Sequence, residues 1–252
     1  MEGAVKVFGV LGFTVGVFAF GQSLPLGGIP VTQATCSSPV VSLVQQNNQI
    51  FGSCTSCTVT ITSAPANGDV IVLAVLTNHP VTTASTISSV TSTNTTWTRD
   101  SQNANFSGTH ADLELWHGIV SGGAGGTSVT VVVSASLPSN SSTYNVSEWS
   151  GVNTSTTVDG VAATATSTSN TVTTPSYSTA GTCELVIAVE GSATNGSISA
   201  FPGAPYTNLT NPNGGSTAAY NVLSPMGAQG AANWTLSTSR PWGAIILGYN
   251  HT

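Results

Sequence analysis

Hydrophobic and polar residues alternate over short stretches along most of the chain, and no long stretch has the 3.6-residue period of a helix. The alternation is clearest where Val129, Val131 and Val133 fall on one face. Turn residues at 65–68 and 122–126 separate such stretches. The strands predicted in this way span residues 40–44, 57–61, 70–76, 87–91, 96–99, 111–120, 128–134, 144–149, 157–174, 184–190, 218–222, 233–237 and 242–249. The stretch 157–174 is of low complexity, rich in Thr, Ser and Ala, and we expect it to include an exposed edge strand.

This series of short strands at regular spacing predicts an all-β fold, an antiparallel β-sandwich or jelly roll. Residues 22–39 are rich in Pro, Gly and small polar residues, which predicts an extended N-terminal arm before the sandwich. No break in composition divides residues 40–252. We therefore expect them to form one jelly-roll β-sandwich domain.

The first 21 residues have the pattern of a secretory signal peptide. Lys6 precedes an apolar run at 7–20, and small residues lead to the polar Gln22. The run is about 14 residues long, whereas a membrane span needs roughly 20, so we expect cleavage and no membrane insertion of the mature chain. An uncleaved apolar segment packed in an assembly remains the alternative, because Glu2 interrupts the basic start.

Charged residues are scarce, and this excludes several classes of partner. They make up 5% of the 252 residues, the net charge is −6, and the basic residues are Lys6, Arg99 and Arg240. Nucleic acids and anionic membrane surfaces are bound through clustered Lys and Arg, which this chain lacks. Solubility must then come from hydroxyl and amide groups or from attached sugars.

The four cysteines are Cys36, Cys54, Cys57 and Cys183. An even number in an exported chain predicts two disulfides, with three connectivities open. Cys54 and Cys57 have the spacing of half a zinc site, but no second close Cys or His pair completes it. We therefore interpret all four as disulfide cysteines.

N-glycosylation acceptor patterns, Asn-x-Ser/Thr, are frequent. Some arise by chance in a chain so rich in Asn, Ser and Thr, but in an exported protein they predict partial occupancy by N-linked glycans. The acceptor residues are Asn94, Asn105, Asn140, Asn145, Asn153, Asn195, Asn208, Asn233 and Asn250.

The most suggestive polar cluster is His110, Asp112 and Glu114, which alternate along a predicted strand and so share a face. Such a face could hold a cation, or its two carboxyl groups could act on a sugar, although a solvated strand face is the simpler interpretation. Glu184 and Glu190 bracket an apolar strand, where we expect water to reach them.

No catalytic motif is present, so we expect neither enzymatic activity nor a cofactor. Neither a nucleophile elbow nor a phosphate-binding loop occurs in the chain. The five tryptophans could stack on sugars, but aromatic residues in strands more often belong to a core. They are Trp97, Trp116, Trp149, Trp234 and Trp242.

Several stretches resemble a jelly-roll module of bacterial and archaeal extracellular proteins, which has no shared catalytic motif. They cover about 180 residues, in the order and spacing of that fold. The stretches are GDVIVLAV (68–75), SSVTSTNTTWTR (88–99), ELWHGIVSGGAGGTSVTVVVSAS (114–136), VSEWSGV (146–152), ELVIAVEG (184–191) and the segment 218–249.

With its arm, the chain also resembles archaeal extracellular filaments of the thread or donor-strand pilus kind. There an N-terminal extension completes a sheet of the next subunit, and because the contact is head-to-tail it propagates. The resemblance implies Leu24, Leu26, Ile29 and Val31 as donor-strand residues. Pro25 and Pro30 depart from it, since each lacks a backbone donor. A linker, or a first strand of the same domain, remains the alternative.

We therefore expect a structural subunit of an extracellular, archaeal filament or pilus on the cell surface, assembled from identical subunits by strand donation. The alternative is a glycosylated carbohydrate-binding or adhesive module of a surface or virion.

Overall fold

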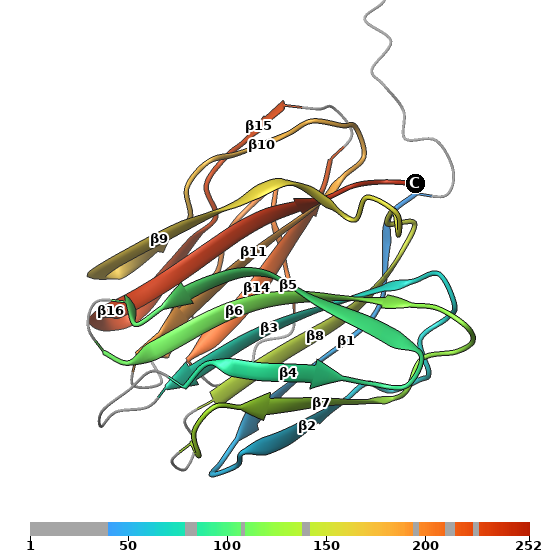
Figure 1. The fold of residues 1–252 in the computed structure, drawn as a ribbon. Coiled ribbons are helices and arrows are strands. Elements are labelled where there is room, and N and C mark those ends of the chain that lie inside the picture. The colour runs from blue at the N-terminus through green and yellow to red at the C-terminus, as the bar shows by residue number, and fades with distance from the viewer. Residues whose placement is uncertain are drawn as a thin grey trace, which may run out of the picture. The chain divides into compact units, whose positions relative to one another are not determined.

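A computed structural model describes residues 40–78, 85–106, 109–137, 142–193, 197–209, 215–223 and 227–252. In these residues the elements are strands joined by turns and loops, and every pairing between strands is antiparallel. The predicted all-β sandwich is confirmed (Figure 1). The predicted signal peptide at 1–21 and the arm at 22–39 lie outside the described residues and stay predictions.

A five-stranded sheet lies in the middle of the fold, and we call it the central sheet. Its strands, in spatial order, are β1 (Ser42–Phe51), β8 (Ser142–Ser150), β3 (Val70–Asn78), β6 (Ala111–Val120) and β5 (Thr95–Ala104). A three-stranded sheet, the small sheet, covers one of its faces. Its strands are β2 (Ser56–Thr60), β7 (Ser128–Val133) and β4 (Ile87–Thr91).

A third sheet, the outer sheet, covers the opposite face of the central sheet. Its strands are β9 (Val158–Thr173), β16 (Asn233–Tyr249), β11 (Leu185–Ser192), β14 (Ser216–Val222) and β13 (Thr207–Asn208), with β12 (Ile198–Ala200) also paired to β16. A two-stranded ribbon, β10 (Tyr177–Thr179) with β15 (Gly227–Gln229), lies beyond it. Tyr177 of this ribbon lies against Gly248 of β16.

The fold has three layers where the sequence suggested two, and β3 shows why. Val72 and Leu76 of β3 point into the core shared with the outer sheet. Ile71, Leu73 and Val75 point into a second core shared with the small sheet. All nine residues of β3 are buried, which explains its unbroken apolar sequence, because a strand covered on both faces needs no polar side.

Candidate functional site: buried acids and a free strand edge

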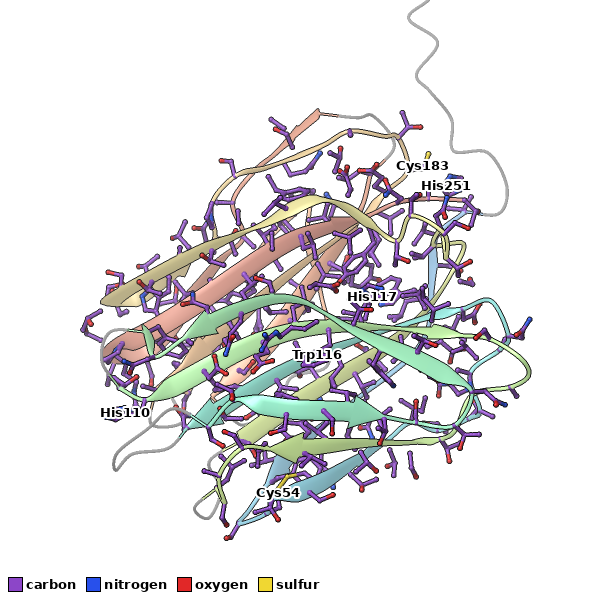
Figure 2. All side chains as sticks on the ribbon, viewed as in Figure 1. Cys54, His110, Trp116, His117, Cys183 and His251 are labelled. Carbon is purple, nitrogen blue, oxygen red and sulfur yellow. A yellow bond between two sulfur atoms is a disulfide. The ribbon has the colours of Figure 1, made fainter. Side chains whose placement is uncertain are left out.

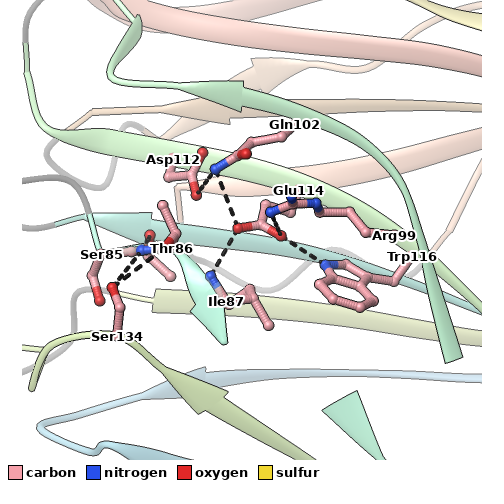
Figure 3. Close-up of polar contacts among 10 residues, drawn as sticks. Ser85, Thr86, Ile87, Arg99, Gln102, Asp112, Glu114, Trp116 and Ser134 are labelled. Atoms are coloured by element: carbon pink, nitrogen blue, oxygen red, sulfur yellow. Dashed lines mark hydrogen bonds and ion pairs between the residues drawn. The ribbon is translucent and has the colours of Figure 1, made fainter. Parts of the chain in front are cut away.

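Asp112 and Glu114 lie on the face of β6 that the small sheet covers, and each is 1% exposed (Figure 3). The expectation that this face is solvated was therefore wrong. An alternating pattern marks which residues share a face, but not whether another sheet covers that face.

Nitrogen donors surround the two carboxyl groups. Gln102 Nε2 lies 3.0 Å from Asp112 Oδ2 and 3.5 Å from Glu114 Oε1. Glu114 also accepts hydrogen bonds of 2.8 Å from the Ile87 backbone N–H and from Trp116 Nε1–H. Through Ile87, which begins β4, Glu114 joins the central sheet to the small sheet.

The pair binds a proton more tightly than an isolated carboxyl group. Burial, and then the hydrogen bond and charge of Glu114, raise the pKa of Asp112 to about 8. Gln102 and Arg99 act in the opposite direction, and Arg99 Nη1 lies 3.6 Å from Glu114 Oε2. The Arg99 side chain is 43% exposed, so water screens it.

Asp69 and Glu148 form a second pair, between the start of β3 and β8. Glu148, 1% exposed, accepts hydrogen bonds from Gln45 Nε2–H and, at 3.0 Å, from the Ala66 backbone N–H. Burial, and then the hydrogen bond and charge of Glu148, raise the pKa of Asp69 to about 7. Asp69 itself is half-buried.

Asp159 and Glu184 form a third pair, between β9 and the residue before β11. Two consecutive backbone N–H groups hold them: Ala180 donates to Asp159 Oδ2 at 2.9 Å, and Gly181 donates to Glu184 Oε1 at 2.7 Å. Burial, and then Asp159, raise the pKa of Glu184 to about 7.

Glu190 is buried without another acid beside it. It is fully enclosed in β11, and its Oε1 accepts a 3.0 Å hydrogen bond from the Thr217 backbone N–H. Burial raises the pKa of Glu190 to about 8. The expectation that water reaches Glu184 and Glu190 was wrong, because Glu184 is 2% exposed and Glu190 is 0% exposed.

The remaining acid, Asp100, is part of a different network. Its Oδ1 lies 2.5 Å from His117 Nδ1, and its Oδ2 accepts a 2.8 Å hydrogen bond from the Tyr249 hydroxyl. This network joins β5 and β6 to β16 across the core, on the face of β6 opposite Glu114 (Figure 2).

The predicted trio of His110, Asp112 and Glu114 is not one continuous strand face. His110 precedes β6 with a positive φ of 60°, whereas the two acids lie within β6. In the described parts of the chain, no three His, Cys, Asp or Glu side chains are grouped so that they could hold a metal ion. A carboxyl pair that cleaves a sugar must flank its substrate, but Asp112 and Glu114 are enclosed between two sheets.

None of the five tryptophans is exposed. Trp149, Trp234 and Trp242 are buried, and Trp97 and Trp116 are half-buried against the second core. Their rings thus pack against the cores, and none of them is presented as a fully exposed ring.

A disulfide joins Cys54 to Cys57, just before β2 and within it, and Cys183 is also disulfide-bonded. Cys36 lies outside the described residues. All three cysteines in the described residues thus form crosslinks.

The acceptor asparagines differ in their accessibility. Those that are exposed are Asn94, Asn105, Asn208 and Asn233, and those that are half-buried are Asn153 and Asn250. Asn145 lies within the strand predicted at 144–149, and it is 5% exposed in the middle of β8. Asn140 and Asn195 lie outside the described residues.

β9 presents the longest free strand edge of the described fold. It is 16 residues long and pairs with β16 alone among the described strands. Residues 160–173 contain no charged residue and no proline, and Val161 is 86% exposed. The low-complexity stretch was predicted to include an exposed edge strand, and β9 is that strand.

Comparison with family models, curated proteins and solved structures gives no match. In the described part of the chain, no helix is long and apolar enough to cross a membrane.

Proposed function

We propose that the protein is a structural subunit of an extracellular filament of the thread or pilus kind, in which the arm of one subunit adds a strand to the sheet of the next. The observation that carries this proposal is the free edge of β9. It lies in the outer sheet, at the side of β16 that β11 does not occupy (Figure 1).

An open edge of this kind needs a partner. Proteins protect sheet edges with charges, prolines, bulges or short strands, because unpaired N–H and C=O groups recruit other chains. Residues 163–169 pair with β16 without a register shift and contain neither a charge nor a proline. Register shifts interrupt the pairing of β9 on either side of this stretch, and β1 likewise has a bulge at Val44. In β1, however, Gln45 also bonds the backbone of Ser63.

The arm at 22–39 of an identical subunit suits this edge. Eighteen extended residues span roughly 60 Å, close to the length of a strand of sixteen. The arm has no charged residue, so its approach to an uncharged edge costs no charge desolvation. Val161 offers an apolar contact beside the edge for Leu24, Leu26, Ile29 or Val31. An arm that reaches a second copy adds subunits head-to-tail and without closure.

A charged edge tests the proposal directly. Thr164→Lys with Thr166→Lys places two charges on exposed positions of β9, and Thr96→Lys with Thr98→Lys is the matched control on β5, another edge strand with two exposed threonines. We expect threads in negative-stain images of the full chain and of the control, and isolated particles for the β9 variant and for a chain without residues 22–35.

Far-UV circular dichroism establishes that each variant is folded. Threads formed by the chain without residues 22–35 contradict strand donation, and threads formed by the β9 variant contradict β9 as the acceptor. A chain that stays monomeric but binds a glycan array is instead an adhesive module.

A further inference from the structure

We propose that each of the three carboxyl pairs holds one shared proton in the folded protein, so that the sandwich is built for an acidic medium and loses stability as the medium approaches neutrality. This inference rests on the fold alone and does not depend on the proposed assembly.

The first argument is the position of the acids. Six of the eight acidic residues in the described chain form the pairs Asp69–Glu148, Asp112–Glu114 and Asp159–Glu184. Two carboxylates cannot share a buried site while both are charged, because their repulsion adds to the cost of removing each from water. One proton turns the repulsion into a hydrogen bond.

The second argument comes from single oxygen atoms. Asp112 Oδ1 and Glu184 Oε2 are buried, and no N–H or O–H group of the described residues donates to them. A charged oxygen in that position would be costly, whereas protonation of the carboxyl group removes the charge. In both residues the other oxygen accepts a hydrogen bond, from Gln102 and Gly181 respectively.

The same donors distinguish a shared proton from a bound cation. A cation site is lined by oxygens, such as carboxylates, carbonyls and water. Here N–H groups face the carboxyl groups: Gln102 at the first pair, Ala66 and Gln45 at the second, and Ala180 with Gly181 at the third. They suit one negative charge spread over two carboxyl groups and would repel a metal ion.

Few other charged or titratable groups face these pairs. Arg99 approaches Glu114 at 3.6 Å and favours the charged form there. Tyr177 of the ribbon donates to the Asp159 backbone oxygen and feels the charges of Asp159 and Glu184. The groups that pack on Asp69 and Glu148 from β1 and the 61–68 turn, Gln45 and Ala66, are neutral.

Two of the pairs join segments that are distant in sequence and the third contacts a strand of another sheet, so ionisation of each acts on the packing of the fold. Asp69 and Glu148 are 79 residues apart (148 − 69) and connect the start of β3 with β8. Asp159 and Glu184 connect β9 with the chain entering β11. Asp112 and Glu114 contact β4 through the Ile87 N–H.

The direction of the pH dependence follows from the pKa values. The pKa of Asp69 is raised to about 7, that of Asp112 to about 8 and that of Glu184 to about 7, from ordinary values of 3.8, 3.8 and 4.5. The folded protein therefore keeps protons that the unfolded chain has released. Stability is fully present below about pH 4 and is lost as the pH rises through 7 to 8.

Chemical unfolding of the full chain between pH 4 and pH 8 tests this inference. We expect the unfolding constant to rise with pH, by up to about tenfold per pH unit for each shared proton. Asp112→Asn keeps the shape of the side chain and can donate permanently to Glu114. The unfolding constant of this variant should therefore rise less steeply with pH, by about the contribution of one proton. Tyr220→Phe, which is outside the pairs and removes no group that titrates in this range, should keep the wild-type slope.

An independent readout covers variants that fail to fold. The infrared band of protonated carboxyl groups should be present at pH 6 in the folded Glu190→Gln variant, where Glu190 cannot contribute to it, and vanish on unfolding. The inference is wrong if this band is absent, if the unfolding constant does not change between pH 4 and 8, or if added calcium stabilises the protein at pH 8 as strongly as acid does.

Discussion

Trp149 of β8 and Tyr220 of β14 meet edge to face, with ring centroids 4.9 Å apart and ring planes at 69°. Trp149 is fully buried, and its indole N–H donates to Ser147 Oγ at 2.8 Å on the same strand. The contact joins the central sheet to the outer sheet, whose other links include the Asp100–Tyr249 hydrogen bond. Aromatic packing therefore contributes to holding these two layers together.

Removing this contact should weaken the fold in a measurable way. We expect Trp149→Ala to lower the free energy of unfolding by about 3–5 kcal/mol, because it empties a buried site. Tyr220→Phe retains the ring and serves as the control, with little change expected. A double-mutant cycle of Trp149→Ala with Tyr220→Ala should give a coupling of about 1 kcal/mol, and a coupling of zero would show that the rings do not interact.

Gly151, which follows β8, cannot be replaced without strain. Its φ is +78°, and a Cβ there would lie 2.9 Å from the Val40 backbone oxygen. We expect Gly151→Ala to cost about 2 kcal/mol or more in urea unfolding, since the left-handed conformation alone costs 1–2 kcal/mol. Gly52→Ala is the matched control, because a Cβ at Gly52 meets nothing within 4 Å. Equal losses in the two variants would contradict this explanation.

The strands of the two large sheets were predictable because the alternation of hydrophobic and polar residues and the positions of turn residues indicate the same strand boundaries along most of the chain. β4 and β6 begin and end where the alternation placed them, and the edge strand β9 was recognised from its Thr/Ser/Ala composition. The polar second half of β1 was not predicted, since pairing with β8 decides its conformation. β10, β12, β13 and β15 are two or three residues long, too short for any pattern to appear.

The candidate site was harder to predict because it depends on which faces are covered. The sequence places Asp112 and Glu114 on one face but contains no sign that β4 of the small sheet lies over it. The pairs Asp69–Glu148 and Asp159–Glu184 are distant in sequence, so only the fold brings them together. The shortage of lysine and arginine was the one signal in the sequence for these pairs, because an acid that is buried without a cationic partner must be stabilised in another way.

Glycosylation should follow the accessibility of the acceptor asparagines. Glycopeptide mass spectrometry of native material should find sugars at exposed positions such as Asn94, Asn105, Asn208 and Asn233 and none at Asn145, whose side chain is enclosed in β8. Asn145→Gln should leave the glycan mass unchanged, whereas Asn208→Gln should remove one glycan. Sugar on Asn145 would contradict this prediction and show that glycans are attached before the domain folds.

Glu190 offers a test of buried-acid energetics that does not involve a pair. Its Oε2 is buried and receives no hydrogen bond, and burial raises its pKa from 4.5 to about 8. Since the folded protein retains this proton above the pKa of the unfolded chain, Glu190 contributes stability below about pH 4.5 that is lost as the pH rises to about 8. Glu190→Gln cannot ionise. We therefore expect its free energy of unfolding to increase relative to that of the wild type by on the order of 1 kcal/mol per pH unit across that window.

Thr217→Ala, which removes only a hydroxyl 3.5 Å from Glu190 Oε1, is the control. It should shift the free energy of unfolding without removing its dependence on pH. Guanidinium unfolding at pH 4, 6 and 8 measures all three proteins, and parallel curves for Glu190→Gln and the wild type would show that Glu190 is charged in the fold throughout.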